Sequence, residues 1–450
     1  MPQTCDGVDT SLGSGTSSNG SQWKIFVHIE ETTTYFDIPM DVTATAHGEV
    51  KVRAATDPPP DGGWRAWLCV LCGHFIFMNT WGFINSFGIF QTYYTSVLDL
   101  PAADVSWIGS IQVFLSFFIG AVVGRYTDAG YLRLMLVCGA TLILVGIFTA
   151  SCATQYWQLV LSQGICCGLG NGFLVTPAVA VVSTYFERKR SLVIGLTTCG
   201  SVTGGLIFPA MARQLIPTIG FAWTLRAIGF VQLATLAVIM AFMKSRLPPQ
   251  SPYHLVDWAS FKEREYTFFT VGMFFNFWAV FFGYFFLGSF SRDVIGLTYV
   301  ESLNLLLVLN GVGIIGRTLP NYLADKVGPL GMLIPACLLA SVMVFSWIAV
   351  HTLSQLYAWT VLYGIIGGSI LSLFPAGISS LTTDLSTRGA RIGMNFTVIS
   401  FAVLTGNPIA SAIIAAQHGA YIGAQVFMGI SLLVGMVFIY FAQIIKEKSA

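Results

Sequence analysis

Long apolar runs recur along this chain from residue 66 onward, and the stretches between them hold most of the charges. Each run is roughly 20 residues or longer, the length at which a helix crosses the hydrocarbon core of a bilayer. The pattern therefore predicts twelve membrane-spanning helices, at 66–94, 105–126, 132–152, 156–182, 191–213, 221–243, 267–291, 301–324, 330–350, 355–383, 390–416 and 420–445.

The composition favours a membrane protein over a soluble one. Hydrophobic residues make up 55% of the 450 residues and charged residues only 10%. A soluble domain cannot hide that much apolar surface, whereas lipid accepts it. The net charge of +1 gives no reason to expect a nucleic-acid partner. Cys69 and Cys72 have no second cysteine pair or nearby histidine. We expect an all-α polytopic membrane protein that holds no metal and no cofactor.

The chain divides into four parts. Residues 1–60 are rich in Ser, Thr, Gly and acidic residues, and we expect a disordered tail there. Residues 61–243 form the first predicted six-helix bundle, and residues 267–450 form the second. A charged connector at 244–266, which contains Pro248 and Pro249, lies between them.

Positive residues gather in one set of connecting stretches, which predicts the orientation. They are Arg125, Arg133, Arg188, Lys189, Arg190, Lys244, Arg246, Lys262, Arg264, Lys326, Arg388, Arg391, Lys446 and Lys448. Loops rich in Lys and Arg stay on the cytoplasmic side. We therefore expect a monomeric, multi-pass plasma-membrane protein with both termini and the connector in the cytoplasm.

The two halves share matched positions. Pro177, Arg190 and Gly195 recur as Pro375, Arg388 and Gly393, with one offset of 198 positions. Gly124-Arg125 also recurs as Gly316-Arg317, and each pair precedes an aspartate near a predicted cytoplasmic turn, Asp128 or Asp325. Such repeats favour two pseudo-symmetric bundles with a solute site between them, as in alternating-access carriers.

Three segments resemble a known family. Residues 61–67 read DGGWRAW, residues 185–195 read YFERKRSLVIG, and Gly316-Arg317 precedes ADKVG at 324–328. They resemble signatures of the monocarboxylate-transporter-like branch of the major facilitator superfamily, particularly its fungal members. The resemblance covers roughly residues 57–446. It implies the major facilitator fold, in which two six-helix bundles carry a small organic solute.

Two positions depart from the resemblance. Lactate carriers of this branch have a lysine in the middle of helix 1 and an aspartate about one turn before the helix 8 arginine. Asn85 and Gly313 occupy those places here, while Arg317 remains. The departure argues against simple proton–lactate symport and weakly favours a larger product or nutrient, such as a metabolite for export.

Five residues are candidates for substrate binding. Arg317 either binds a substrate carboxylate with its guanidinium or pairs with Asp325 at the cytoplasmic end. Asn85 and Asn310 are intramembrane amides on helices 1 and 8, which line the cavity in the resembled family. Trp81 and Tyr284 are candidates for contact with a flat organic substrate. For each residue, packing between helices is the alternative.

Candidates for coupling or gating are fewer, because no Asp or Glu lies near the middle of any predicted span. His74 is either a proton relay or a hydrogen-bonded packing residue. Asp325 and the pair Arg125 and Asp128 lie at cytoplasmic ends. Arg188 and Arg190 are topology determinants or, by the resemblance, parts of a latch. The sequence therefore favours uncoupled transport and proton-coupled transport about equally.

We expect a secondary or facilitative carrier of a small organic solute, with that solute, the lipid bilayer and, if coupled, protons as its partners. The alternatives are a proton-coupled monocarboxylate symporter and a non-transporting sensor on a carrier fold. A membrane-embedded enzyme is disfavoured because the six histidines are scattered.

Overall fold

The computed structural model describes residues 59–96, 98, 101–247, 258, 260–382 and 387–449, together with four short strands near the N-terminus. The chain separates into Met1–Pro58 and Pro59–Ala450. In the first unit, β1 (Leu12–Gly13) pairs antiparallel with β2 (Lys24–Ile25), and β3 (Met40–Ala44) with β4 (Val50–Ala54). The sequence suggested no strands here. The rest of the tail predicted to be disordered lies outside the described residues.

The second unit is helical. Its first half contains α1 (Trp64–Phe77), the π-helical turn η1 (Met78–Gly82), α2 (Phe83–Asn85), α3 (Phe87–Ser96), α4 (Ala102–Phe118), α5 (Gly120–Asp128), α6 (Leu132–Ala150), α7 (Tyr156–Leu159), the π-helical turn η2 (Val160–Cys166), α8 (Cys167–Tyr185), α9 (Arg190–Thr198) and α10 (Gly200–Phe242). Its second half contains η3 (Ser260–Lys262), α11 (Arg264–Asp293), α12 (Tyr299–Val327), α13 (Pro329–Ser346), η4 (Trp347–Ala349), α14 (Leu353–Leu381), α15 (Arg388–Ala416) and α16 (Ile422–Ser449).

The twelve predicted spans are accounted for. Eleven helical stretches in the described residues are long and apolar enough to cross a bilayer. One of them, Arg190–Phe242, has 53 residues, which is about twice the length a span needs. Inside it, Gly220 has φ 79° and ψ 168°, which breaks the helix between the predicted fifth and sixth spans. This stretch therefore crosses the membrane twice.

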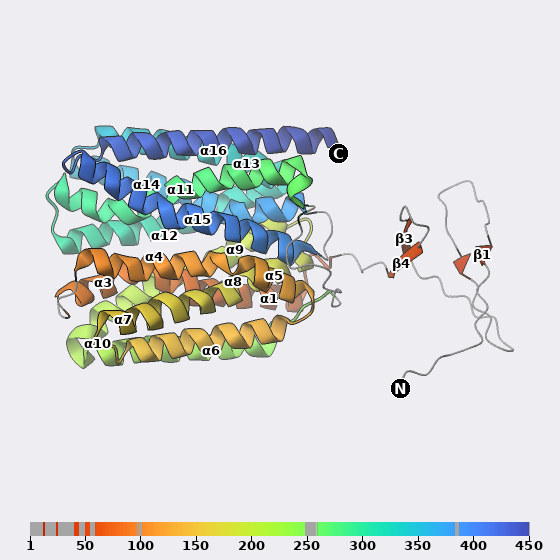
Figure 1. The fold of residues 1–450 in the computed structure, drawn as a ribbon, viewed down its shortest axis with the longest axis horizontal. Helices are drawn as coiled ribbons and strands as arrows, with labels where there is room; N and C mark the ends of the chain where they lie inside the picture. The colour runs from red at the N-terminus through yellow and green to blue at the C-terminus, as the bar shows by residue number, and fades with distance from the viewer. Residues whose placement is uncertain are drawn as a thin grey trace. The chain divides into compact units, whose positions relative to one another are not determined.

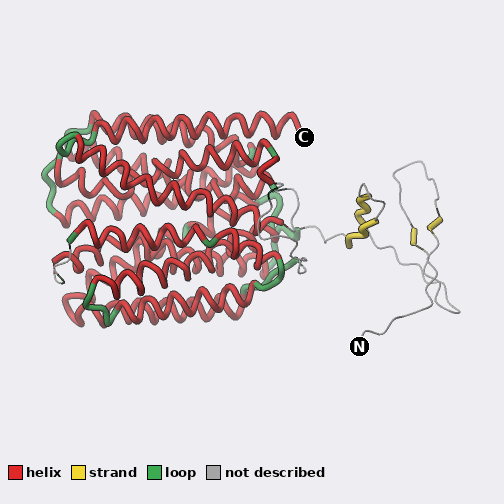
Figure 2. The backbone as a smooth tube through the Cα atoms, viewed as in Figure 1, coloured by secondary structure: helices red, strands yellow, loops and turns green. Residues whose placement is uncertain are grey.

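The helices lie side by side with roughly parallel axes, and the two halves occupy separate sides of the bundle (Figures 1 and 2). The halves meet along two seams. Helices α4 and α5 pack against α15, and helices α9 and α10 pack against α12. The second and fifth spans of one half thus contact the eleventh and eighth spans of the other, as expected from the internal repeat.

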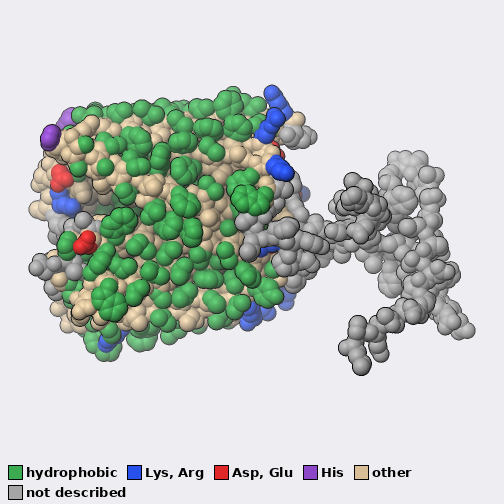
Figure 3. Space-filling view, in the orientation of Figure 1, with side chains coloured by type: hydrophobic (Ala, Val, Ile, Leu, Met, Phe, Trp, Pro, Cys, Tyr) green, Lys and Arg blue, Asp and Glu red, His purple; other side chains and the backbone are tan. Residues whose placement is uncertain are grey.

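Apolar side chains cover the flank of the bundle (Figure 3). Exposed residues such as Leu134, Phe230 and Leu339 lie on this surface, where lipid takes the place of a protein core. Lys and Arg side chains gather at the end that holds the C-terminus (Figure 3). The flank is therefore suited to hydrocarbon, and the basic end is the predicted cytoplasmic end.

Within the first half, the helices reach backbone contact. A Cβ atom on Gly82 would lie 2.5 Å from the Cα atom of Gly204, and one on Gly200 would lie 1.9 Å from the carbonyl oxygen of His74. Only glycine fits at such separations, so these residues let α10 press against the first span at its π-helical turn. Trp81 lies in this π-helical turn.

Candidate functional site

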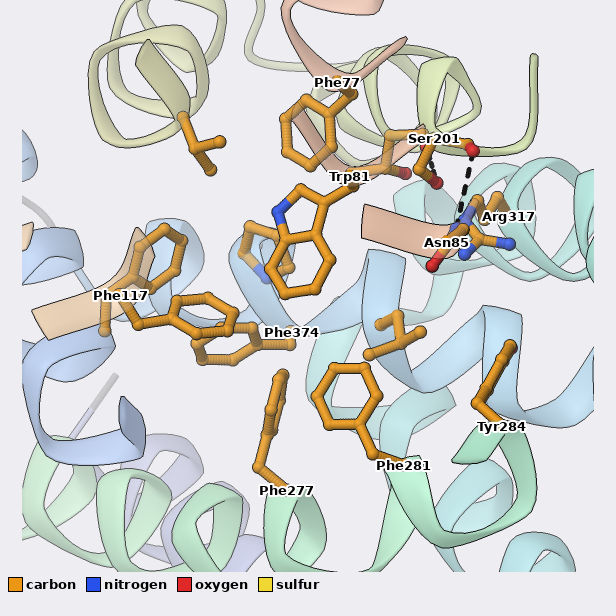
Figure 4. Close-up of a pocket in the computed structure, with 15 residues that line it drawn as sticks. Phe77, Trp81, Asn85, Phe117, Ser201, Phe277, Phe281, Tyr284, Arg317 and Phe374 are labelled. Carbon is orange, nitrogen blue, oxygen red and sulfur yellow. Dashed lines mark hydrogen bonds between the residues drawn. The ribbon is translucent and has the colours of Figure 1, made fainter. Parts of the chain in front are cut away.

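A narrow central pocket lies between the two halves (Figure 4). Its cavity volume is about 50 Å³, which leaves little more than room for water. The first half contributes Phe77, Trp81, Asn85, Phe117, Val175, Thr198 and Ser201, and the second half contributes Phe277, Phe281, Tyr284, Arg317, Leu371, Phe374, Pro375 and Phe396. Because both halves supply walls, any relative motion of the halves changes the shape of the pocket.

Aromatic rings from opposite halves meet in this pocket. Trp81 faces Phe281 with ring centroids 6.0 Å apart and ring planes 5° apart. Phe117 lies 5.1 Å from Trp81, and its centroid is 5.2 Å from Phe396 across the interface. Aromatic pairs at such separations attract each other. The rings close most of the pocket in this conformation.

Arg317 is the charged residue among those that line the pocket. Its side chain is 3% exposed, its Nη1 donates to the carbonyl oxygen of Gly313 at 3.2 Å, and its Nε has no partner among the described residues. A buried guanidinium without a counter-ion is costly, and an anion in the pocket would relieve that cost. Gly313, where the resembled carriers have an aspartate, leaves this guanidinium unpaired.

The alternative pairing of Arg317 with Asp325 is wrong for this conformation. Both oxygens of Asp325 accept backbone N–H groups, from Ser191 at 2.7 Å and from Leu192 at 3.0 Å. Among the described residues, no carboxylate forms an ion pair with Arg317. Position 325 is eight residues after position 317, which puts the two side chains about 12 Å apart along the helix axis. Arg317 therefore belongs to the pocket, and Asp325 belongs to the end of the helix.

A larger vestibule of about 950 Å³ opens at the other end of the bundle from the connector, which is the predicted extracellular end. Asn85 lines both the vestibule and the central pocket, and Asn310, Arg213 and Tyr93 are among the other vestibule residues. A Cβ atom on Gly205 would lie 3.4 Å from Cβ of Asn85 and 3.9 Å from Cγ of Asn310. Gly205 therefore lies between the two amides, where the vestibule approaches the central pocket.

The structure brings all five candidate binding residues to these two cavities, which share Asn85. Trp81, Asn85, Tyr284 and Arg317 line the central pocket, and Asn85 and Asn310 line the vestibule. Asn310 is 7% exposed, its Nδ2 donates to Leu306, and its Oδ1 has no partner among the described residues. Sequence reasoning missed several pocket members, namely Phe77, Phe117, Ser201, Phe374 and Phe396. Nothing in the sequence distinguishes these side chains from the many other aromatic and hydroxyl side chains of the spans.

His74 lies outside both cavities. Its Nδ1 is 2.9 Å from the carbonyl oxygen of Leu196, and its Nε2 is 3.0 Å from the hydroxyl of Thr203. A carbonyl oxygen only accepts, so Nδ1 donates there, and the Thr203 hydroxyl beside Nε2 also lies 3.4 Å from the carbonyl oxygen of Cys199. This arrangement matches the packing alternative, because the ring joins the first span to α9 and α10.

Two aspartates join the halves at the predicted cytoplasmic end. Asp325, at the end of α12, accepts the first amides of α9. In the matching place, Asp128, at the end of α5, accepts the N–H groups of Gly389 at 3.0 Å and Ala390 at 2.8 Å, at the start of α15. Helix N-termini offer unpaired N–H groups and a partial positive charge, so a carboxylate binds there favourably. We call these two contacts the paired latch.

Glycines bring the backbones together beside the paired latch. A Cβ atom on Gly195 would lie 2.2 Å from the carbonyl oxygen of Arg317, and one on Gly393 would lie 1.9 Å from that of Gly120. Gly195 and Gly393 are the matched glycines of the internal repeat. The repeat thus marks two equivalent seams, each with a glycine contact and an aspartate at a helix N-terminus.

The remaining gating candidates lie at the same end. Arg190 begins α9, and its Nε donates to the carbonyl oxygen of Phe186 at 3.2 Å. Arg188 has an exposed side chain, while its backbone N–H donates to Asp61 at 2.9 Å. Arg125 lies in α5, three residues before Asp128, and lines neither cavity. Of these three, Arg190 and Arg125 are next to the helix ends that form the paired latch.

The two signature segments of the N-terminal half touch each other. Oδ1 of Asp61 accepts the backbone N–H of Glu187 at 2.7 Å and that of Arg188. The indole of Trp67 meets the ring of Phe186 edge to face, with centroids 5.5 Å apart. The start of the first span is therefore fastened to the loop that leads into α9.

Comparisons with known proteins agree with this architecture. The sequence matches the Major Facilitator Superfamily over residues 69–386. It is 70% identical over 399 residues to an "MFS-type transporter" of Gibberella zeae, across 88% of this chain and 90% of that protein. A protein of Emericella nidulans named "Aspyridones efflux protein apdF" is 32% identical over 394 residues, across 87% of this chain and 80% of the relative.

Solved structures share the fold. The major facilitator transporter FucP in its outward conformation superposes with a TM-score of 0.65 at 16% identity, covering 83% of this chain and 98% of that one. A bacterial homologue of the iron transporter ferroportin, in its outward-facing state, gives a TM-score of 0.68 at 12% identity, covering 83% and 98%. At such identities the likeness concerns the fold alone. Together with the sequence matches, it shows that the chain belongs to the major facilitator superfamily of transporters.

Proposed function

We propose that this transporter exports a small, largely apolar organic anion by alternating access. The observation that carries the proposal is Arg317, a buried guanidinium without a carboxylate partner, in an aromatic pocket between the two halves. Pockets for small organic molecules are mostly apolar with a few well-placed polar groups. A guanidinium binds carboxylates through two parallel N–H bonds, so an organic acid fits this pocket.

The arrangement of closed and open ends supports alternating access. The paired latch and its glycine seams hold the halves together at the predicted cytoplasmic end, while the vestibule opens at the opposite end. Rocking of the halves that releases the latch would close the vestibule and expose the central pocket to the cytoplasm. Arg317 and Asp325 lie on the same helix, α12, so the guanidinium and one of the two contacts of the paired latch move together.

The direction of transport follows from the charge of the proposed substrate. A plasma membrane that is negative inside drives an anion outward with about 2.3 kcal/mol per 100 mV. The described spans have no Asp or Glu near their middle to couple this movement to protons. Efflux is also the activity printed for the relative named for aspyridones, and that name describes the relative only. We therefore favour uncoupled export over proton symport.

We further propose that the chain belongs to the monocarboxylate-transporter-like branch, lies in the plasma membrane with both termini in the cytoplasm, and is a monomer. The branch rests on the two signature segments that Asp61 joins. The apolar flank supports a location in a membrane, and the basic end of the bundle supports the orientation (Figure 3).

Flux of organic acids into proteoliposomes tests the proposal. Arg317→Gln is expected to lower anion flux at least tenfold, since a charge-assisted hydrogen bond is worth about 1.5–3 kcal/mol. Arg133→Gln, at an exposed arginine, is the matched control. Unchanged kinetics in a correctly inserted Arg317→Gln protein would remove Arg317 from the site. No flux of any acid would favour a sensor, and a chemically altered product would favour an enzyme.

A further inference from the structure

The two facing rings in the central pocket form a slot whose walls belong to different halves. Trp81 projects from the first span and Phe281 from α11, and their planes are parallel within 5°. The ring centroids are 6.0 Å apart, a separation typical of offset-stacked aromatic pairs, so the two rings stack on each other in this conformation. A flat ring held between them needs ring planes about 7–8 Å apart, twice the carbon–carbon contact distance, so it can enter only when the halves move and separate the two rings.

The polar groups of the pocket lie at one end of this slot. Figure 4 shows Arg317, Asn85 and Ser201 on one side of the Trp81 indole, with Phe117 and Phe374 on the other side. Nδ2 of Asn85 is 3.5 Å from the carbonyl oxygen of Ser201, which points this amide toward its own half. A molecule in the slot thus meets a cation at one end and only aromatic rings at the other.

We propose that the transported class is a planar, conjugated organic acid with one negative charge at the edge of its ring system. The ring system lies between Trp81 and Phe281, and the acidic group binds Arg317. This inference rests on the proposed function and adds the requirement of flatness. A saturated ring is thicker than a conjugated one and would force the walls further apart, while a neutral ring would leave the buried guanidinium without a counter-ion.

The slot also links recognition to transport. Because one wall belongs to each half, the distance between the rings changes when the halves rock. A flat ring gains stacking contacts on both faces, and each aromatic contact stabilises the arrangement of the halves that holds it. Flatness of the substrate therefore affects the rate of transport as well as binding.

Three probes of similar size test the class in proteoliposomes, with half-saturating concentrations as the readout. 2-Naphthoate is flat and charged, 2-naphthamide is flat and neutral, and trans-decalin-2-carboxylate is charged and saturated. We expect 2-naphthoate to half-saturate at a concentration at least fivefold below that of either other probe. Equal half-saturating concentrations for the two carboxylates overturn the proposal of a planar substrate but are consistent with an exporter of organic anions. Equal values for naphthoate and naphthamide overturn both proposals.

Variants assign the discrimination to the slot. Phe281→Leu is expected to raise the half-saturating concentration of 2-naphthoate more than that of the decalin carboxylate, and so to bring the ratio of the two values close to one. Phe275→Leu is the matched control, because Phe275 lies on the same helix, lines neither cavity and stacks on Phe438 within the second half. The slot is overturned if Phe281→Leu leaves the ratio of half-saturating concentrations unchanged. It is also overturned if Phe275→Leu lowers that ratio as much as Phe281→Leu does. If none of the probes moves while short aliphatic acids do, the class is wrong and the export function stands.

Discussion

Gly313 gives the sharpest test of the anion site, because a side chain at this position would meet the guanidinium of Arg317. A Cβ atom there would lie 2.5 Å from Nη1 of Arg317, and its next neighbours are 3.7 Å away. Nη1 is the tip of a flexible side chain, so the guanidinium can move aside. Gly313→Asp therefore places a carboxylate next to Arg317, as in the carriers that the sequence resembles.

The size of the effect follows from competition between this carboxylate and the substrate anion. Two unit charges 4 Å apart attract by about 4 kcal/mol at an effective dielectric constant of about 20. Desolvation of the new carboxylate removes part of that gain. A net weakening of about 1.5–3 kcal/mol remains, which corresponds to a rise on the order of 10- to 100-fold in the half-saturating concentration of an organic acid.

The assay compares two substitutions of the same size. Gly313→Asn displaces the guanidinium as Gly313→Asp does but brings no charge, so its half-saturating concentration should stay within about threefold of the unmodified protein. Both variants are measured by uptake of a labelled organic acid into proteoliposomes at matched protein density. Equal rises in the half-saturating concentration of the two variants would show that a side chain at position 313 acts only by its volume and that Arg317 does not bind the anion.

Three further predictions concern other parts of the chain. The Ser151 hydroxyl and then the Arg226 guanidinium lower the pKa of the exposed Cys152 thiol, so a membrane-impermeant maleimide should label intact cells at Cys152. Arg226→Gln should raise this pKa and slow labelling near neutral pH, and labelling only after permeabilisation would contradict the orientation. Asp61→Ala should destabilise the cytoplasmic end by about 0.5–2 kcal/mol, seen as a lower unfolding temperature in detergent. An unchanged unfolding temperature would show that the two hydrogen bonds that Asp61 accepts from backbone N–H groups do not stabilise this end. An inside-negative potential of about 100 mV is worth about 2.3 kcal/mol for one charge, so it should change the steady-state ratio of outside to inside concentration of a carried monoanion about 50-fold. A concentration ratio that does not change with the potential would exclude uncoupled transport.

The fold was largely predictable because lipid imposes a simple length rule on apolar helices. The rule found the twelve spans, including the break near Gly220 that separates the fifth from the sixth. The repeat of Gly195 as Gly393 also indicated two equivalent halves. What the glycines do was not predictable, since their backbone contacts with Arg317 and Gly120 exist only once the halves are packed.

The candidate site was predictable only in part. Polar and aromatic residues on helices expected to line a cavity, such as Asn85 and Tyr284, do line one. Trp81 and Phe281 stack because of a π-helical turn and because two helices distant in the sequence pack together. The spacing of apolar residues along the sequence predicts neither feature. The possible pairing of Arg317 with Asp325 failed because the two residues are more than two helical turns apart.

Access to the vestibule tests the central claim that the halves rock about a shared site. Gly205→Cys places a thiol between Asn85 and Asn310 at ordinary contact distances, 3.4 and 3.9 Å, in a Cys152→Ser background. We expect a membrane-impermeant thiol reagent to label it from outside. Asp325→Asn, which weakens the paired latch and favours the inward-open state, should slow that labelling several-fold. The same labelling rate with and without Asp325→Asn, together with unchanged solute flux, would contradict alternating access controlled by the paired latch.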